Sequence, residues 1–487
     1  MGTNNNEVRI IKNDLGIIRL TAFAIGTTLA SGVFSISGDM AANGANTAAV
    51  LTGWAISGVG MIALMMCFFG LNIYRPDLKS GVYSYAKEGF GEYVGFNSAF
   101  GYWISAIFAN ISFATLLFAA LGRFFPIFGD GNNLISIIVA SIFIWFTVYL
   151  VLRGVSQAAT INLIVVIAKI LPILVLILAI LFLRAFKPAI FMQNFWGEPG
   201  GPGFFDQVKA TVITTVWTFV GIEGAVVISG RAKKQKDAGT AGVIAFLTLL
   251  VIYVMISVLS MGVMTRAELA ELGNPPMAGV LEHVMGPFGA GLVNFAVILS
   301  LTGATFAYTM LAAEAGYEPA VQGAFPKGLA GENKKKAPSA SLIVTNVIIQ
   351  IFLLIVFFNN STYQIFYSLS ANMIMVPYFL SAMYYLKILI RKEDQIAEFS
   401  SGKYFLQLLI AIGGTVYGIW MLYASGLINL LITTILYFPG TLLYIWRNRE
   451  RGTKSFKNKI DLVIFLVIFA LFVISIVMIA NGSIKPF

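Results

Sequence analysis

The sequence predicts an all-α integral membrane protein, and three observations lead to that class. Of the 487 residues, 58% are hydrophobic and only 11% are charged, and the mean hydropathy is +0.85. Soluble domains carry roughly a quarter of their residues as charges, so a soluble core of this composition would lack a polar surface. Apolar runs of about twenty residues, long enough to cross roughly 30 Å of hydrocarbon, recur along the whole chain. The cationic residues gather between alternate runs, as they do in membrane proteins.

Thirteen membrane-spanning segments are predicted from the apolar runs and the polar stretches between them. The first fourteen residues are polar and carry no secretory signal, so we expect no leader to be removed. They form the N-terminus at 1–14, which the distribution of Lys and Arg predicts to be cytoplasmic. The predicted segments are 15–38, 46–73, 95–122, 133–152, 157–183, 208–230, 239–264, 285–313, 340–358, 363–390, 404–424, 427–446 and 461–481.

The distribution of Lys and Arg predicts the orientation of these segments. With the N-terminus inside, 25 of the 32 cationic residues lie at the inner ends and six lie outside. The remaining one, Lys169, falls within segment five. This is the positive-inside bias. The net charge of +10 therefore reflects topology and contact with anionic lipid in a bacterial plasma membrane, and it requires no nucleic-acid partner.

Cysteine and histidine are too scarce to support most kinds of catalytic site. A single cysteine, Cys67, excludes an intrachain disulfide, and the only histidine, His283, lies beside a predicted loop. No cluster of metal-ligating residues and no nucleophile–base pair is apparent at membrane depth. We therefore expect no metal, no cofactor and no enzyme activity.

Two segments carry residues that interrupt a helix at membrane depth. Segment one contains AIGTTLASGVF (24–34) and segment six contains WTFVGIEG (217–224). Unwound backbone is tolerated in a membrane where it lines a cavity within the protein. The two segments are five apart and run in opposite directions, which predicts an inverted repeat with a substrate site between the breaks. Close helix packing through small residues is the alternative explanation.

The ends of the broken helices predict the kind of ligand. An exposed helix start binds anions through free N–H groups and the positive end of the helix dipole. In segment one these N–H groups belong to Ser31, Gly32 and Val33. Carbonyl groups freed near Thr28 and from Trp217 to Val220 would accept hydrogen bonds from an ammonium group. A site with both features would bind an α-amino acid.

Glu223 and Lys169 are the ionisable residues that the sequence places within the membrane. Placing a charged side chain at this depth costs a few kcal/mol even on the scale derived from membrane insertion, which gives the lowest values. An ionisable residue there therefore suggests a function. Glu223 could exchange a proton or link the broken helices, or it could be a hydrogen-bonded structural carboxyl. Lys169 could occupy the place of a coupling sodium ion by binding a freed carbonyl of segment one, or it could extend to the membrane surface.

Several stretches resemble the basic amino acid/polyamine antiporters of the amino acid–polyamine–organocation superfamily. They include SGVF (31–34), SGVYSYAKEGFGEYVGFNSAFGYW (80–103) and VWTFVGIEGAVVISGRAKKQKDAG (216–239). The likeness runs from about residue 14 to residue 480 and is strongest to bacterial arginine/ornithine antiporters. It implies a leucine-transporter-like fold with inverted five-helix repeats at 15–183 and 208–390, followed by peripheral helices at 404–481.

The resemblance also implies which residues contact the substrate. The implied binding residues are Thr27, Thr28, Ser31, Gly32, Val33, Tyr102, Ser105, Asn110, Trp217, Val220, Tyr308 and Asn372. Ser31 and Gly32 would bind the substrate carboxylate. Trp217 would form a middle gate, Tyr102 an outer aromatic gate, and Glu223 an acid linked to closure of segment one.

The expected function is exchange of an external amino acid for a related internal amino acid or amine by alternating access. Two positions depart from the pattern of arginine exchangers: Tyr308 stands where a tryptophan is usual, and Asn372 stands where the arginine/ornithine subgroup has an acid. They leave open exchange of an amino acid for its decarboxylation product, such as tyrosine for tyramine or histidine for histamine. A proton-coupled importer and a non-transporting receptor are further alternatives. A homodimer is compatible with the sequence.

Overall fold

The computed structural model describes residues 16–78, 81–153, 159–223, 235–359, 362–456 and 458–484. The predicted cytoplasmic N-terminus at 1–14 lies outside these ranges. The loop between segments six and seven, together with the later part of segment six, also lies mostly outside them.

Ten helices of the described chain are long and apolar enough to cross a membrane. They match predicted segments two to four and seven to thirteen, with ends that agree within four residues, except that segment eight continues to Val321. The helices are α3 (Thr47–Tyr74), α5 (Glu92–Gly122), α6 (Leu134–Leu152), α12 (Gln235–Val263), α15 (Pro287–Val321), α16 (Ser339–Asn359), α17 (Tyr363–Arg391), α18 (Ser401–Ala424), α19 (Leu427–Glu450) and α20 (Lys459–Ala480). Segment five corresponds to α7 (Ala159–Phe182).

Segment one is discontinuous, as predicted. It consists of α1 (Ile17–Thr28), a short 3₁₀ turn η1 (Gly32–Phe34) and α2 (Ile36–Ala42). The helical hydrogen-bond ladder ends with the N–H of Leu29, which donates to the carbonyl of Ile25 at 2.8 Å. The N–H of Ala30 donates to the carbonyl of Thr28 at 2.8 Å instead of reaching back to Gly26. The segment resumes when the N–H of Asp39 bonds to the carbonyl of Ser35 at 2.9 Å.

The described part of segment six also ends in a turn. A short helix α9 (Phe204–Ala210) leads into α10 (Val212–Phe219). Val220 has φ −59° and ψ 129°, and Gly221 has φ 99°. With the hydrogen bond from the N–H of Ile222 to the carbonyl of Phe219 at 3.1 Å, this is the pattern of a type II turn, which requires a positive φ at its third residue. Gly221 therefore ends the helix because glycine adopts that conformation without a steric penalty.

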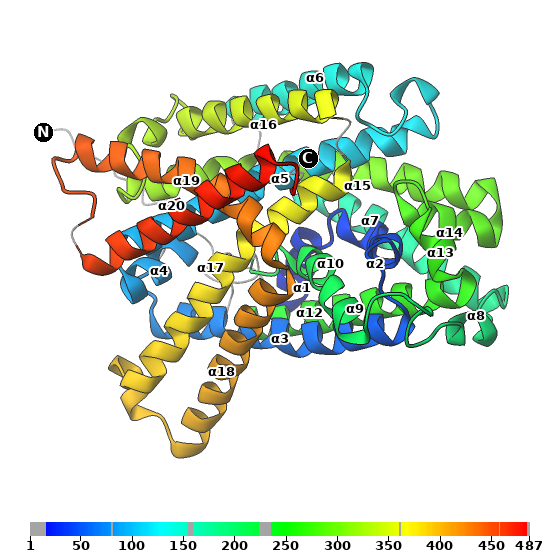
Figure 1. Ribbon diagram of the computed structural model, residues 1–487, viewed down its shortest axis with the longest axis horizontal. Coiled ribbons are helices and arrows are strands. Elements are labelled where there is room, and N and C mark those ends of the chain that lie inside the picture. The colour runs from blue at the N-terminus through cyan, green and yellow to red at the C-terminus, as the bar shows by residue number, and fades with distance from the viewer. Residues whose placement is uncertain are drawn as a thin grey trace, which may run out of the picture.

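Helix α5 lies at the centre of the molecule and α20 at its edge (Figure 1). In the most apolar 18-residue stretch of α5, 94% of the residues are buried within the protein, whereas in the corresponding stretch of α20 only 6% are buried. Helices α15 and α17 pack against α5, while α10 packs against α17, α3 and η1. Both broken segments thus reach the core, and α20 presents an apolar surface suited to lipid.

Short helices connect the spanning segments at both ends. In Figure 1, α8 (Pro188–Met192), α13 (Arg266–Ala270) and α14 (Pro276–Met285) lie at the end of the molecule opposite α4 (Val82–Phe90). Further 3₁₀ turns are η2 (Pro126–Phe128), η4 (Lys327–Ala330) and η5 (Asp394–Glu398). The sequence did not predict these elements, because each is too short for its hydrophobic period to be recognised.

Candidate functional site

The two breaks lie directly against one another. A Cβ atom placed on Gly32 would come within 3.0 Å of Trp217 Cδ1 and of Thr218 Cγ2. Gly32 therefore allows the backbone of segment one to approach the end of α10 more closely than any other residue would. The predicted juxtaposition of segments one and six is confirmed by this contact between η1 and α10.

Three backbone N–H groups at the break have no partner in the part of the chain that the structure describes. No group in the described ranges accepts a hydrogen bond from the N–H of Ser31, Gly32 or Val33. Ser31 is 0% exposed and Val33 is 1% exposed, so water cannot readily satisfy these donors. Buried N–H groups in native proteins are nearly always paired. The arrangement thus offers an anion three donors that the protein itself leaves unused.

The carbonyl groups predicted to bind an ammonium group are near the same point, and several already accept hydrogen bonds. The carbonyl of Thr218 accepts from the Tyr253 hydroxyl at 3.0 Å, and that of Trp217 accepts from the N–H of Val220 at 3.2 Å. Each carbonyl oxygen has a second lone pair. Capacity for an ammonium donor therefore remains at the end of α10. Thr27 and Thr28 are the last two residues of α1, and the structure describes only the backbone of Thr27.

Tyr363, the first residue of α17, joins both breaks through its hydroxyl group. The hydroxyl donates to Ser31 Oγ at 3.2 Å and accepts from Trp217 Nε1 at 3.1 Å. It also lies 3.2 Å from Ser35 Oγ. Tyr363 was not predicted from the sequence, because it follows a polar loop and resembles an ordinary aromatic residue at the membrane boundary.

Aromatic rings cover the break on the side of α17 and α5. Trp217 stacks on Tyr367, with ring centroids 5.6 Å apart and an interplanar angle of 23°. Phe113 lies 5.9 Å from Trp217 and meets Tyr308 edge-on at 4.9 Å. Trp217 is only 4% exposed. The predicted aromatic residues Trp217 and Tyr308 therefore belong to one cluster that encloses the break in this conformation.

Glu223 is held by two tyrosine hydroxyls from different helices. Its carboxylate accepts hydrogen bonds from Tyr102 of α5 at 3.2 Å, from Tyr378 of α17, and from the backbone N–H of Gly221 at 3.1 Å. Glu223 thus connects segment six to α5 and α17, whereas the sequence led us to expect a link to segment one. Within the described ranges, Glu223 forms no hydrogen bond with segment one.

Tyr102 lies on the α4 side of the break, where it contacts Glu223. It is ten residues from the start of α5, which places it about 15 Å along that helix at 1.5 Å per residue. The start of α5 adjoins α4, at the end of the molecule away from α13 and α14 (Figure 1). Tyr363 begins α17 beside the break, where its hydroxyl contacts Ser31 and Trp217. With the predicted cytoplasmic N-terminus, the α4 end would be the inner side, which differs from the outer gate expected at Tyr102.

Lys169 contacts the carbonyl group that the break in segment one sets free. Its Nζ lies 3.0 Å from the carbonyl oxygen of Gly26, which the N–H of Ala30 does not reach. The side chain is buried, so it does not extend to the membrane surface. This is the contact that the sequence predicted between segments five and one.

Three predicted pocket residues lie on or beside α5, with different surroundings. Ser105 forms hydrogen bonds with the carbonyl and hydroxyl oxygens of Ser370, at 2.9 and 3.0 Å, and so joins α5 to α17. Asn110 donates to the carbonyl of Ala106 at 3.0 Å. Asn372 is buried, and its Oδ1 has no hydrogen-bond partner among the described residues. Of the three, Asn372 keeps an unused acceptor for a ligand.

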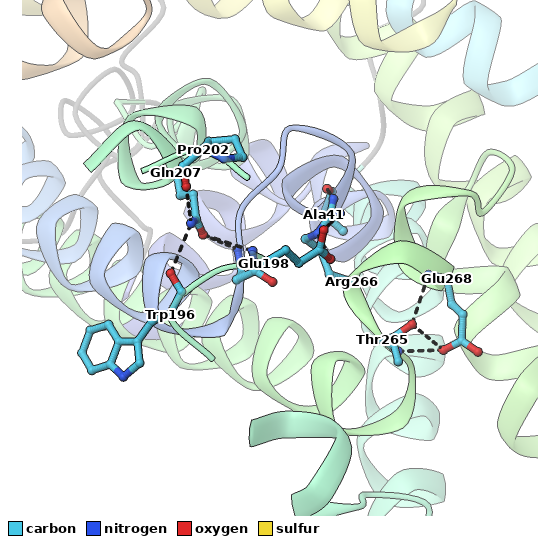
Figure 2. Close-up of polar contacts among 9 residues, drawn as sticks. Ala41, Trp196, Glu198, Pro202, Gln207, Thr265, Arg266 and Glu268 are labelled. Carbon is cyan, nitrogen blue, oxygen red and sulfur yellow. Dashed lines mark hydrogen bonds and ion pairs between the residues drawn. The ribbon is translucent and has the colours of Figure 1, made fainter. Parts of the chain in front are cut away.

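A polar network holds the loops at the α8 and α13 end of the molecule (Figure 2). Arg266 pairs with Glu198 at 2.7 Å and donates to the carbonyl of Ala41, the penultimate residue of α2, at 3.2 Å. Gln207 donates to the carbonyls of Trp196 and Pro202 at 3.2 and 2.9 Å. The Arg266 guanidinium holds the pKa of the Glu198 carboxyl below its usual value. The contact with Ala41 ties the α2 end of segment one to this network.

A cavity of about 340 Å³ lies at the other end of the molecule, beside α4. It is remote in sequence from both breaks and contains residues of both charges. Its lining residues are Asp77, Leu78, Tyr83, Ser84, Lys87, Glu88 and Gln322.

A discontinuous helix in segment one that meets a helix end in segment six, within a multi-pass helical membrane protein, is typical of a solute transporter. Residues 15–439 match the amino acid permease family, and the chain belongs to that family of transporters. It is therefore a membrane transporter and not an enzyme.

Several relatives that are similar to this chain over nearly their whole lengths are amino acid transporters. The chain is 42% identical to an arginine/ornithine antiporter of Pseudomonas aeruginosa, over 92% of this chain and 94% of the relative. It is 36% identical to an L-lysine transport protein of Corynebacterium glutamicum, over 97% and 96%. It is also 36% identical to an arginine/agmatine antiporter of Chlamydia abortus, over 95% and 97%. The resemblance to arginine/ornithine antiporters stated from sequence motifs is confirmed.

Proposed function

We propose that this protein exchanges an external amino acid for a related internal amino acid or amine, with arginine and ornithine as the leading pair. The observation that carries the proposal is the set of three unpartnered N–H groups at Ser31, Gly32 and Val33, next to the carbonyl end of α10. A carboxylate satisfies the first set and an ammonium group the second. The relatives are named as transporters of arginine or lysine, which supports a basic amino acid as the substrate that is taken up.

The proposed architecture is two inverted five-helix repeats, residues 15–183 and 208–390, followed by peripheral helices at 404–481. The equivalent positions of the breaks in segments one and six support it. The Lys and Arg distribution supports a cytoplasmic N-terminus and a plasma-membrane location. The lipid-facing α20 and its neighbour α19 leave room for a homodimer at the periphery.

Trp217 and Tyr363 form the proposed gate on the outer side of the substrate. Both are buried and joined by a hydrogen bond, and Tyr363 also bonds Ser31 beside the carboxylate site. On the inner side, Tyr102 and Tyr378 bind Glu223 and form the second gate. Alternating access then requires that one of these two sets of contacts open while the other remains closed.

Lys169 supplies a fixed positive charge at the freed carbonyl of segment one. A coupling sodium ion in transporters of this architecture binds freed carbonyl groups of unwound helices. Since the Lys169 ammonium contacts the Gly26 carbonyl, we propose exchange without sodium coupling. Arginine and ornithine carry the same charge, so their exchange would be electroneutral.

The test is uptake of labelled arginine into proteoliposomes. Vesicles loaded with ornithine should take up arginine at least about tenfold faster than empty vesicles, since exchange requires an internal partner. Equal uptake by loaded and empty vesicles would contradict obligate exchange.

A second candidate is exchange of an amino acid for its decarboxylation product. Asn372 favours it, because a neutral side chain lacks the charge that would attract a guanidinium, while its Oδ1, without a partner among the described residues, suits a hydroxyl or an imidazole N–H. Counterflow distinguishes the two. Vesicles loaded with tyramine or histamine should drive tyrosine or histidine uptake under the second proposal and should leave it at the empty-vesicle rate under the first.

A proton-coupled importer that uses Glu223 is the third possibility. It predicts that an inward proton gradient accelerates uptake into empty vesicles, and that Glu223→Gln abolishes the acceleration. Exchange predicts no uptake into empty vesicles with or without the gradient.

A further inference from the structure

Asp39, in the outer half-helix α2, is a buried carboxylate that the protein does not fully satisfy. Its exposed fraction is 3%. Oδ1 accepts a hydrogen bond from Gln364 Nε2 at 3.1 Å, whereas Oδ2 has no partner in the part of the chain that the structure describes. The hydroxyls of Ser35 and Tyr367 are the other polar groups that face the carboxyl. A carboxylate removed from water needs a cation or a full set of donors.

The neighbouring residues do not supply that cation. None of the ion pairs formed within the described ranges includes Asp39. Arg266 is the basic residue that contacts α2, but its guanidinium is occupied by Glu198 and by the Ala41 carbonyl (Figure 2). Gln364 exchanges hydrogen bonds with Asn274, at 2.7 and 3.1 Å, and is neutral.

Asp39 lies one helical turn outside the proposed gate. It follows Ser35 by four residues, which places both on one face of the segment, and Ser35 lies beside the Tyr363 hydroxyl. Its hydrogen-bond donor Gln364 directly follows Tyr363 in α17. The carboxylate therefore lies between the α13 end of the molecule and the contact between Tyr363 and Trp217.

We infer that Asp39 is an outer subsite that binds the guanidinium or ammonium group of a substrate before it passes the gate. The inference rests on the proposed exchange function and adds a residue that selects substrates by charge. A guanidinium group suits the site, because it presents donors in a planar fork that matches a carboxylate. The unpartnered Oδ2 supplies the acceptor.

The experiment measures competition in vesicles loaded with ornithine. External agmatine and external citrulline compete with labelled arginine; agmatine carries the guanidinium without the carboxylate, and citrulline is a neutral analogue of arginine. Asp39→Asn should raise the half-inhibitory concentration of agmatine at least about tenfold, because a charge-assisted hydrogen bond is lost. The value for citrulline should change less than about twofold, since citrulline brings no charge to the carboxylate. Equal shifts, or no shift, would overturn the inference.

Asp206→Asn is the matched control. Asp206 is an acidic residue at the α13 end, with a side chain that is 62% exposed and paired with Lys209. Its replacement removes one negative charge without touching the proposed subsite. We expect both half-inhibitory concentrations to remain unchanged in this variant. An agmatine shift as large as that of Asp39→Asn would show that surface charge, and not the subsite, is responsible.

A measurement on the unchanged protein guards against misfolding of the Asp39 variant. Guanidinium ion at low concentration should inhibit arginine uptake competitively, whereas urea, its neutral analogue, should not. Equal effects of the two would contradict a cation subsite. If wild-type vesicles show no dependence on internal ornithine, the exchange proposal itself fails. If they show exchange and Asp39→Asn leaves the agmatine-to-citrulline ratio unchanged, only the Asp39 inference fails.

Discussion

The indole N–H of Trp217 donates a hydrogen bond to the hydroxyl of Tyr363 at 3.1 Å. This contact joins the end of α10 to the start of α17, and the same hydroxyl reaches Ser31 in segment one. Three segments that are far apart in the chain therefore meet at one oxygen atom. An element that opens at this point would uncover the unpartnered N–H groups of the break.

Removal of that hydroxyl should weaken substrate retention. Tyr363→Phe leaves the Trp217 indole without its acceptor at a cost of about 1 kcal/mol. We expect the KM for external arginine to rise about fivefold, which corresponds to that energy. Tyr385→Phe is the control on the same helix, because its hydroxyl bonds Gln407 at 2.6 Å, away from both breaks. An unchanged KM in Tyr363→Phe would contradict the gate.

Gly32→Ala should impair transport without preventing assembly. The added Cβ would lie 3.0 Å from Trp217 Cδ1, and overpacking of this kind costs about 1–3 kcal/mol. We expect uptake at limiting arginine to fall about tenfold or more, as that energy implies. Gly291→Ala provides the control, because a Cβ there meets no atom within 4 Å. Equal uptake by the two variants would show that close approach at Gly32 is not required.

Lys169→Met should abolish most exchange. The change removes a charged donor from the Gly26 carbonyl, and such hydrogen bonds contribute about 1.5–3 kcal/mol. Uptake into ornithine-loaded vesicles should fall at least about tenfold, while replacement of sodium by choline should not affect the wild type. Lys187→Met, at an exposed position, should behave as wild type. Sodium-dependent uptake by the wild type would refute the proposed role of Lys169.

Low pH should weaken the ion pair between Arg266 and Glu198. Because Arg266 lowers the pKa of Glu198 in the folded protein, the carboxylate stabilises the fold above its unfolded pKa, near 4.5. That contribution is lost as the pH falls through the folded-state pKa. For a partly exposed pair it is at most about 1 kcal/mol. Glu198→Gln should therefore lower the Tm slightly at pH 7, with a difference that vanishes in acid. Glu271→Gln, at an exposed position, is the control and should leave the Tm unchanged at either pH. A Tm difference for Glu198→Gln that does not depend on pH would contradict the stabilising role of this ion pair.

Much of the fold could be predicted from the sequence because spanning helices are long and uniformly apolar. The break at Gly221 was also predictable, since glycine beside polar residues at membrane depth has few structural explanations. The end of α15 was not, because after residue 313 the helix continues into polar sequence, where hydropathy gives no signal.

Partners in the site were harder to predict than positions. Lys169 could be assigned to a carbonyl of segment one because a buried charge needs an acceptor and the break provides one. Tyr363 and Tyr378 were missed, since their roles depend on how α17 is rotated against α5 and α10. Asp39 was not predicted, because it lies one residue beyond the end of predicted segment one at 38; its signal was an acid four residues after Ser35, in a stretch that is otherwise almost uncharged.

The most direct measurement of the central claim is a cryo-EM structure of the protein with arginine bound. The account predicts that the α-carboxylate lies within hydrogen-bonding distance, about 3 Å, of the N–H groups of Ser31, Gly32 and Val33, with its ammonium group at the end of α10. Density for arginine elsewhere, with the N–H groups of this break paired to protein, would contradict the account.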